Sequence, residues 1–540
     1  MARTTKLSLE EWDTLHNNGP WDLKCLYKTR LEASSLMPSS LDRYNDAALE
    51  IQRLLKETNN QNEGFRAYGS AWSLSHIAHQ KDRMHFNAHM NCYFSFNDQD
   101  LHHLSNYDAD DIFMFECGNV IKEISEKLAG HGKSLKSSGA SNGQTIAGCI
   151  STGVHGSGIK AGSVQDYVVG LNLIIGPNPG DIVYLERHSK PVLNDVFGQK
   201  IRAKVIRNDG LFNAALVGLG SFGFIHGVVI ETQNLFLLKR YVKSIKKELA
   251  IELAESLEFS NFKGIPEEME NGKGRVPYHY KIFINQYQKN DEDYIVELMY
   301  KKDFKLNYPD PFPVIKKSIY RDLIQLAVSL GSQFTGLIPK FVNALESNIL
   351  PKVDEVSIGT LAETFWDAPY QGPAFAISFG VPQDKSGKAL GILSEIARKK
   401  KTPGIFAMRF IKKSDATLSF ARFNKTCMIE IDGVLWNEEK NLGSLNGLSR
   451  EMMIALHNND IPFTLHWGKN ADWAFVGDDW NETTLADYMY KEDAKTWRAY
   501  RSSLLSADMQ KLFSNRFLKE CGLDTTEEVE APDDLIASLI

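Results

Sequence analysis

The spacing of apolar residues between positions 41 and 58 predicts a helix. Its buried face would be formed by residues that recur at helical spacing: Tyr44, Ala48, Ile51, Leu54 and Leu55. The hydroxyl side chains just before it, Ser39 and Ser40, are typical of a helix N-terminus. The next segments alternate in type, with strands expected over 65–68, 111–117 and 167–175 and a helix over 121–129. This part of the chain is therefore expected to mix α and β structure.

Beyond position 234 the segments become longer, more charged and amphipathic, which indicates a second domain. Residues 318–350 follow a helical pattern that Gly331, Gly336 and Pro339 interrupt. Their broad apolar face is expected to pack on this second domain, with docking to a membrane or to a second copy as the alternatives.

Length and charge narrow the class of protein. A chain of 540 residues fits two or three domains, and 43% hydrophobic with 24% charged residues is typical of a globular protein in water. The formal net charge of -7 has the wrong sign for a partner made of phosphate backbone, so no nucleic-acid partner is expected. Residues from about 525 are rich in Asp and Glu and are expected to form a solvated tail.

The sequence gives no sign of export, of a membrane-spanning helix or of a metal site. Residues 1–10 lack the apolar core of a secretory signal, and no run approaches the roughly 18 apolar residues of a spanning helix. The six cysteines show no CxxC spacing. The histidine-rich stretch from His76 to His103 lacks the acids or cysteines that would complete a zinc site. We expect a cytoplasmic protein, with peripheral membrane contact left open.

The most unusual segment runs from Ser137 to Gly162 and holds seven glycines among serine, threonine and asparagine residues. Glycine permits positive φ angles and close approach of the backbone, and bare N–H groups beside short hydroxyl side chains suit a pyrophosphate. A flexible linker is the alternative, but Ile146, Ile150 and His155 within the run are unlike a linker. The segment is therefore predicted to bind phosphate groups.

A second glycine cluster, Gly218, Gly220 and Gly223, matches the GxGxxG string of dinucleotide-binding proteins. That fingerprint requires a helix after the glycines, whereas residues 224–231 have the pattern of a strand. Basic residues such as Lys239 stand where the fingerprint has a ribose-binding acid. We therefore expect a turn beside the cofactor rather than a Rossmann site.

Two loops and a later motif resemble the vanillyl-alcohol oxidase superfamily of FAD-linked oxidoreductases. The first loop reads RAYGSAWS at 66–73, the second contains STGVHG at 151–156, and HWGK follows at 466–469. These strings are most similar to the sugar-lactone and alditol oxidase branch. The resemblance implies an α+β fold, with a two-subdomain FAD-binding domain of the PCMH type and a cap domain built on an antiparallel sheet with flanking helices.

The resemblance also divides the chain and identifies its cofactor. It implies an FAD-binding domain over 1–235, a substrate-binding cap over 236–470, and a C-terminal segment over 471–540 that packs back on the first domain. The residues expected to bind FAD are Tyr68, Gly69, Ser70, Ala71, Trp72, Ser73, Asn142, Gly143, Gly148, Thr152, Gly153, His155, Gly156 and Ile225. Trp72 stands where covalently flavinylated relatives have a histidine, and Cys149 follows the position of their cysteine, so noncovalent FAD is expected.

Four residues of the cap are expected to act on the substrate. A cap strand of the lactone and alditol branch carries Glu-x-Arg, but the corresponding strand here has Ala407 and Arg409. On the next strand Glu430 is expected to replace the missing acid as the base, with its pKa raised by burial. Arg409 and Lys469 would supply positive charge, and His466 would form a wall of the site. An exposed glutamate and a structural ion pair are the plainer interpretations of Glu430 and Arg409.

These residues predict an FAD-dependent oxidase or dehydrogenase that removes a hydride from a CH–OH group of a small molecule. Oxygen or another acceptor would then reoxidise the flavin. Two alternatives stay open: a flavin-dependent oxidative cyclase, and a flavin-binding protein that lost turnover with the acid at 407. The sequence predicts neither the substrate nor the oligomeric state.

Overall fold

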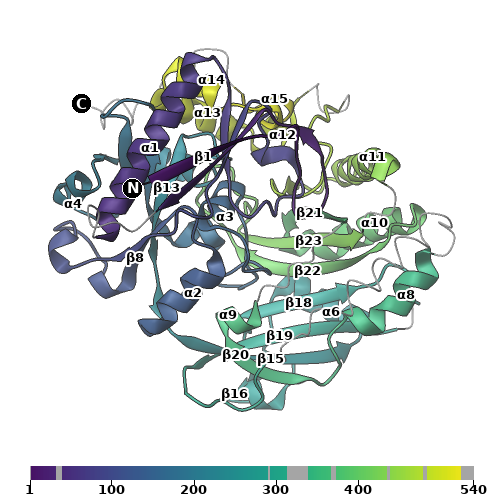
Figure 1. Ribbon diagram of the computed structural model, residues 1–540. Helices are drawn as coiled ribbons and strands as arrows, with labels where there is room; N and C mark the ends of the chain where they lie inside the picture. Colours follow the sequence, from purple (N-terminus) through teal and green to yellow (C-terminus); the bar gives the residue numbers. More distant parts are fainter. Residues whose placement is uncertain are drawn as a thin grey trace.

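Three main β-sheets form the computed structural model of the chain, two of them before residue 235 and one after it (Figure 1). The structure describes residues 2–31, 39–289, 292–312, 338–365, 373–434, 438–477 and 483–524.

The first sheet has four strands in the order β1-β4-β6-β5. They are β1 (Ala2–Ser8), β4 (Cys25–Leu31), β5 (Phe65–Tyr68) and β6 (Arg83–Phe86). Helix α1 (Ser40–Asn60) packs on this sheet, with Ile51 and Leu55 in a common core with Tyr27 and Phe65. Ser39 caps the helix, because its side chain accepts a hydrogen bond from the backbone N–H of Asp42. The helix predicted over 41–58 and the strand predicted over 65–68 are confirmed.

The second sheet has six strands in the order β12-β11-β10-β13-β8-β7. They are β7 (Tyr93–Ser95), β8 (Ile112–Glu116), β10 (Val168–Ile174), β11 (Ile182–Glu186), β12 (Lys204–Arg207) and β13 (Phe224–Glu231). Helices α2 (Ile121–Gly130), α3 (Ile146–Thr152) and α5 (Asp209–Leu216) share its core. Strand β13 follows the GxGxxG glycines directly, so this segment lacks the helix that a Rossmann fingerprint requires.

The third sheet forms the cap and has eight strands, each antiparallel to its neighbours. In spatial order they are β20 (Val356–Thr360), β15 (Phe236–Ile245), β19 (Tyr294–Asp303), β18 (His279–Ile284), β22 (Gly404–Lys412), β23 (Lys425–Val434), β21 (Ala374–Pro382) and β24 (Thr464–Leu465). Figure 1 shows it as the green and teal half of the molecule.

The two faces of the cap sheet differ because side chains alternate along each strand. One face is apolar, with Ile282, Met408 and Ile429 in the main core. Helices α6 (Lys247–Ser256), α10 (Ser386–Lys399) and α11 (Glu438–His457) lie on this side. The other face carries charged residues, among them Arg409 and Glu430, and is the face on which a substrate site can form.

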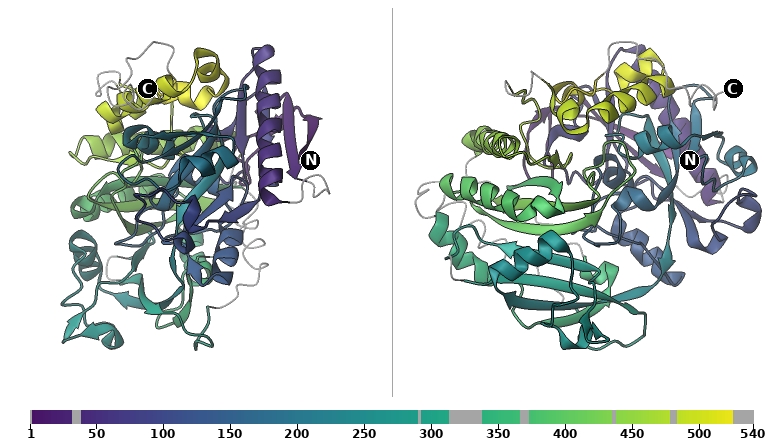
Figure 2. Two further views of the ribbon diagram at one scale, coloured as in Figure 1. Left: turned by 90° about the vertical axis from the view of Figure 1, so that its left-hand side faces the viewer. Right: turned by 180° about the vertical axis from the view of Figure 1, so that it is seen from behind.

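The last helices return to the FAD-binding half of the molecule. They are α12 (Leu485–Tyr490), α13 (Glu492–Leu504), α14 (Ala507–Leu512) and α15 (Arg516–Glu520). Helix α13 contacts α5, and α14 contacts α1. Figure 2 shows these yellow helices beside the purple N-terminal elements. The acidic tail expected from about 525 lies outside the described residues.

The remaining elements are short. They are β2 (Glu11–Trp12), β3 (Trp21–Asp22), β9 (Lys133–Ser134), β14 (Gln233–Asn234), β16 (Met269–Glu270), β17 (Lys273–Gly274), α4 (Asp195–Lys200), α8 (Ile338–Ile349), α9 (Leu361–Thr364) and several 3-10 turns, including η1 (His76–Ala78) and η4 (Val164–Tyr167). The predicted fold class, an FAD-binding α+β domain with an antiparallel cap, is confirmed. Of the helix expected over 318–350, the part before 338 lies outside the described residues.

Candidate active site

A cavity of about 280 Å³ lies between the two glycine-containing loops and the polar face of the cap. Its wall includes the loop after β5, the loops on both sides of α3, and residues 219–225 leading into β13. From the cap it is lined by Arg409, His466, Gly468 and Lys469. Phe513 of the C-terminal segment closes another side. The cavity therefore brings together segments from the whole length of the chain.

Most of the residues expected to bind FAD line this cavity. They are Tyr68, Gly69, Ser70, Ala71, Trp72, Ser73, Gly148, Thr152, His155 and Ile225. Asn142, Gly143, Gly153 and Gly156 are not among the lining residues and lie behind it. Gly153 ends α3 with a φ of 69°, a left-handed conformation that favours glycine. A Cβ on Gly156 would lie 2.0 Å from Ser137 Oγ, so this glycine is required by packing of the loop itself.

Arg66 is a lining residue that the sequence did not single out. It is 3% exposed, and its guanidinium donates hydrogen bonds to the carbonyl oxygens of Ile77 (2.8 Å), Gly220 (2.9 Å), Phe513 (3.0 Å) and Leu219. No carboxylate pairs with it in the described part of the chain. Burial and the neighbouring Arg501 lower the pKa of Arg66 to about 9, so the side chain remains a cation at neutral pH.

The N-terminal segment also reaches the cavity, where Trp12 and His16 are lining residues. The His16 ring meets Trp72 edge to face at 5.6 Å between centroids. Neither residue belongs to a recognisable motif, so only the folded chain reveals their position. Gly143 is required beside Trp72 because a Cβ there would lie 2.7 Å from the indole.

On the cap, Arg409 and Glu430 form a buried ion pair. Arg409 Nη2 lies 2.5 Å from Glu430 Oε1, and the two side chains are 6% and 5% exposed. The register places Glu430 directly opposite Ala407. A carboxylate of the neighbouring strand therefore faces the position at which the resemblance would place a glutamate.

The prediction of a raised pKa for Glu430 was wrong, because the pKa is lowered. Burial does raise it, but the positive charges of Arg409 and Lys469 outweigh burial and hold the pKa at about 2. The next acid on this face, Asp432, is half-exposed and lies 3.7 Å from Lys469. Glu430 is therefore a fixed negative charge, and it does not line the cavity.

A second polar chain continues along the same face. His279 Nε2 lies 3.0 Å from Glu297 Oε1, and His279 Nδ1 lies 2.5 Å from Ser157 Oγ. Ser157 follows the second flavin loop, so this chain joins the loop to the cap. Lys281 is placed opposite both Glu297 and Arg409 by the strand register. Burial, and next the charge of Arg409, lower the pKa of Lys281.

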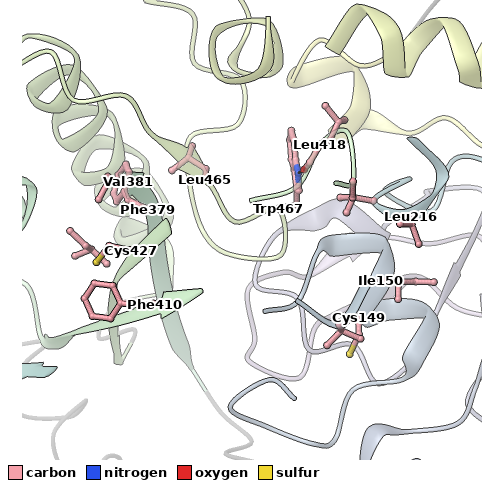
Figure 3. Close-up of a cluster of buried hydrophobic side chains, with 14 of the residues drawn as sticks. Cys149, Ile150, Leu216, Phe379, Val381, Phe410, Leu418, Cys427, Leu465 and Trp467 are labelled. Atoms are coloured by element: carbon pink, nitrogen blue, oxygen red, sulfur yellow. The ribbon is translucent and has the colours of Figure 1, made fainter. Parts of the chain in front are cut away.

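The HWGK segment joins the cap to the first flavin loop. Ser75 donates a hydrogen bond to the carbonyl of Trp467 (2.8 Å), and the N–H of Leu74 donates to the carbonyl of Gly468 (2.8 Å). Trp467 is fully buried, and its Nε1 donates to the carbonyl of Leu418 (2.8 Å). Figure 3 shows Trp467 and Leu418 between two groups of apolar residues, one on the cap and one around α3. The motif is therefore structural as well as part of the cavity wall.

Cysteines and histidines outside the cavity have structural environments. All six cysteines are free and buried, and Cys149 packs inside the main core, as expected for a small packed residue. His79 and His85 each bond to a single neighbouring group, the carbonyl of Asp22 and the hydroxyl of Thr29. Among the described residues there is no cluster of three or more His, Cys, Asp or Glu side chains that could hold a metal ion.

Comparison with known proteins identifies the cofactor domain. Residues 46–183 match the FAD binding domain family. L-gulonolactone oxidase 3 of Arabidopsis thaliana is 33% identical over 123 residues, which are 22% of this chain and 19% of that protein. L-gulono-1,4-lactone dehydrogenase of Mycobacterium tuberculosis is 22% identical over 331 residues, 58% of this chain and 64% of that one. The match thus spans about a fifth of the plant relative's length.

Solved structures share the whole architecture at low identity. Cholesterol oxidase from B. sterolicum superposes with a TM-score of 0.67 at 12% identity, covering 97% of this chain and 98% of that chain. A VAO-type flavoprotein from Myceliophthora thermophila gives 0.55 at 11% identity, covering 90% and 78%. The chain therefore has the fold of the vanillyl-alcohol oxidase superfamily and carries an FAD-binding domain. Within that fold, its sequence resembles the sugar-lactone oxidases and dehydrogenases, as predicted.

The residues around the cavity fit FAD. Arg66 is a buried cation without a carboxylate partner, and a diphosphate would supply the missing negative charge. Glycines at 69, 148, 220 and 223 line the wall, so the backbone can approach a ligand closely.

The described helices include none that is long and apolar enough to cross a membrane.

Proposed function

We propose that the protein is an FAD-dependent oxidoreductase that oxidises a CH–OH group of a small molecule. The proposal rests on one observation. Arg409, which is paired with Glu430, lines the flavin cavity from the polar face of the cap. A guanidinium at this place can hold a substrate oxygen and stabilise negative charge that develops during oxidation. FAD supplies the hydride acceptor, its N5 atom, when bound.

The retained ion pair argues against a degenerate flavin-binding protein. A chain that had lost turnover with the acid at 407 would have no reason to keep two buried opposite charges, since apolar residues are often as stable there. Instead Glu430 stands opposite Ala407 and contacts Arg409 at 2.5 Å. We infer that the pair is kept for chemistry, with Glu430 neutralising and positioning Arg409.

The polar face of the cap favours a hydroxyl-rich substrate. From the cap, Arg409, His466 and Lys469 line the cavity, and an apolar ring system would offer these polar groups no hydrogen-bonding partner. This supports a sugar lactone or an alditol rather than a sterol, in spite of the shared fold with cholesterol oxidase. Oxygen or a second small molecule would then accept the electrons.

The test is anaerobic mixing of the purified flavoprotein with separate aldonolactones, alditols and cholesterol, while the flavin absorbance is followed. We expect at least one polyhydroxylated substrate to bleach the flavin and cholesterol to leave it oxidised. Arg409→Gln should retain FAD and lose rapid bleaching, whereas Arg398→Gln, at the exposed end of α10, should behave as wild type. A flavin that no alcohol or lactone reduces would contradict the proposed function.

A further inference from the structure

Two histidines meet where the second flavin loop reaches the cap. His155 follows α3, and His466 follows β24; both line the cavity and are 4% and 6% exposed. Their ring centroids are 5.2 Å apart, with the rings edge to face. Phe420 contacts both rings, at 5.2 Å from His155 and 5.4 Å from His466. The two imidazoles are therefore held by packing at the junction of the two domains.

Backbone hydrogen bonds assign a different tautomer to each ring. His466 Nδ1 lies 3.1 Å from the N–H of Gly468, which can only donate, so this nitrogen is the acceptor and the ring proton is on Nε2. His155 Nδ1 lies 3.1 Å from the carbonyl oxygen of Gly156, which can only accept, so Nδ1 carries the proton and Nε2 has a free lone pair.

Both rings are neutral in the folded protein. Burial, and next the charge of Arg409, lower the pKa of His155 to about 3, and burial with the neighbouring His155 lowers the pKa of His466 well below its usual value. Neither Nε2 has a hydrogen-bond partner among the described residues. The cavity thus receives one imidazole that accepts a hydrogen bond and one that donates.

Glu430 is less suited to accept a proton. Its Oε1 is bonded to Arg409, its Oε2 is buried without a partner, and the residue does not line the cavity. Protonation would also leave the guanidinium of Arg409 without its counter-charge, which is costly for a buried pair.

We propose that Nε2 of His155 accepts the proton of the substrate hydroxyl, while Nε2–H of His466 donates a hydrogen bond to the same oxygen. The inference rests on the proposed function and names its base. With FAD bound, the flavin would accept the C–H electron pair as hydride, the O–H proton would move to Nε2 of His155, and the C=O bond would form.

The test is single-turnover flavin reduction in His155→Asn, whose amide can still donate to the Gly156 carbonyl but has no base at the Nε2 position. At saturating FAD and saturating substrate, we expect reduction to slow by roughly 10² to 10⁴-fold. Glu430→Gln, which keeps a hydrogen bond to Arg409, should slow it by less than about 10-fold on the same basis. His131→Asn, at the exposed end of α2, is the control and should match wild type.

A second variant separates loss of the base from damage to the loop. His155→Ala leaves room for an imidazole, so added imidazole should restore part of its reduction rate, whereas it should not help His155→Asn, whose amide still fills the site. Reduction of His155→Asn within about threefold of wild type would overturn the inference, and so would an effect of Glu430→Gln as large as that of His155→Asn. Failure of the wild type to be reduced by any alcohol would instead contradict the proposed function.

Discussion

Arg66 combines two properties that rarely occur together, a buried cation and hydrogen bonds that go to backbone carbonyls alone. The carbonyl dipoles compensate part of the desolvation of the guanidinium, but none of the described carboxylates pairs with it. A diphosphate in the adjoining cavity would complete the site. The residue therefore connects the chemistry of FAD binding with the packing of the loops.

We expect Arg66→Met to weaken FAD binding by roughly 10- to 100-fold, because hydrogen bonds to charged groups contribute about 1.5–3 kcal/mol. The measurement is a titration of apoprotein with FAD, followed by quenching of flavin fluorescence. Arg187→Met is a matched control, since Arg187 is half-buried and bonded to Asn213 away from the flavin cavity. An unchanged dissociation constant in Arg66→Met would show that Arg66 only holds the loops.

Noncovalent attachment of FAD remains a prediction, and it has a direct test. Trp72 cannot form the histidyl bond to the flavin, and Cys149 is buried in the core, where burial raises the pKa of its thiol. Acid precipitation should therefore release intact FAD into the supernatant. Flavin that stays with the pellet would point to another lining residue as the attachment site.

At the residue scale, the sequence predicted where the motif residues lie, but not their pKa values or tautomers. The sequence located His155 and Glu430, but it predicted a raised pKa for Glu430, which was wrong. The error for Glu430 has a physical cause, because its pKa depends on Arg409 and Lys469, which the fold brings close from other strands. The tautomer of His155 depends on one backbone carbonyl, which no sequence pattern reveals.

At the scale of elements, strands β22 and β23 carry the buried pair of Arg409 and Glu430. Alternation along the chain predicts which residues share a face, but it does not fix which residue of one strand stands opposite which residue of the next. The register Ala407 to Glu430 was therefore visible only in the structure. Strand β1 was not predicted from the sequence for a different reason. It has few apolar residues and is exposed along much of its length, so no alternation marks it as a strand.

The register predicts that a carboxylate at position 407 of β22 can take the place of the Glu430 carboxylate on β23. Residues directly opposite in a sheet have Cβ atoms roughly 4.5–5.5 Å apart, so a glutamate at 407 approaches the same guanidinium. Glu430→Ala alone should lower the free energy of unfolding by about 3–5 kcal/mol, since it leaves Arg409 buried without its partner. Adding Ala407→Glu should recover much of that loss and of the flavin reduction rate. Thermal unfolding and single-turnover reduction of wild type and the two variants measure both, and a double variant no better than Glu430→Ala would contradict this pairing.

The contact between η4 and the loop after β22 predicts a pH dependence of stability. Burial raises the pKa of Asp166 from 3.8 to about 6. Two hydrogen bonds to its carboxylate, from Ser414 Oγ and from the N–H of Ser163, lower the pKa in part. A raised pKa in the fold means that the contribution of Asp166 is fully present below pH 3.8 and is lost as the pH rises through about 6.

We therefore expect the melting temperature of wild type to fall, relative to Asp166→Asn, between pH 4.5 and pH 7. Asp384→Asn, which changes an exposed carboxylate, should follow wild type at both pH values. Parallel melting curves of wild type and Asp166→Asn across this range would show that Asp166 titrates as it does in an unfolded chain.

At the scale of the whole molecule, the cavity is completed by parts of the chain that are far apart in sequence. The glycine loops were predictable because phosphate binding requires unusual local sequences, and the two-domain fold followed from their resemblance to known proteins. Trp12, His16 and Phe513 could not be found in this way, since ordinary residues reach the cavity only through tertiary packing. The cap and the C-terminal segment thus both line the cavity that fits the cofactor.

The bond from Arg66 to the carbonyl of Phe513 spans 447 positions, and Asn515 donates to the carbonyls of Ile77 and His79 beside it. A ribosome that adds about 5–20 residues per second needs roughly 20–90 seconds to pass from one end of this bond to the other. For most of that time the first flavin loop lacks the segment that closes its cavity. We therefore expect cofactor capture only after residue 513 has left the ribosome, and ribosome-bound chains halted before residue 513 should be colourless.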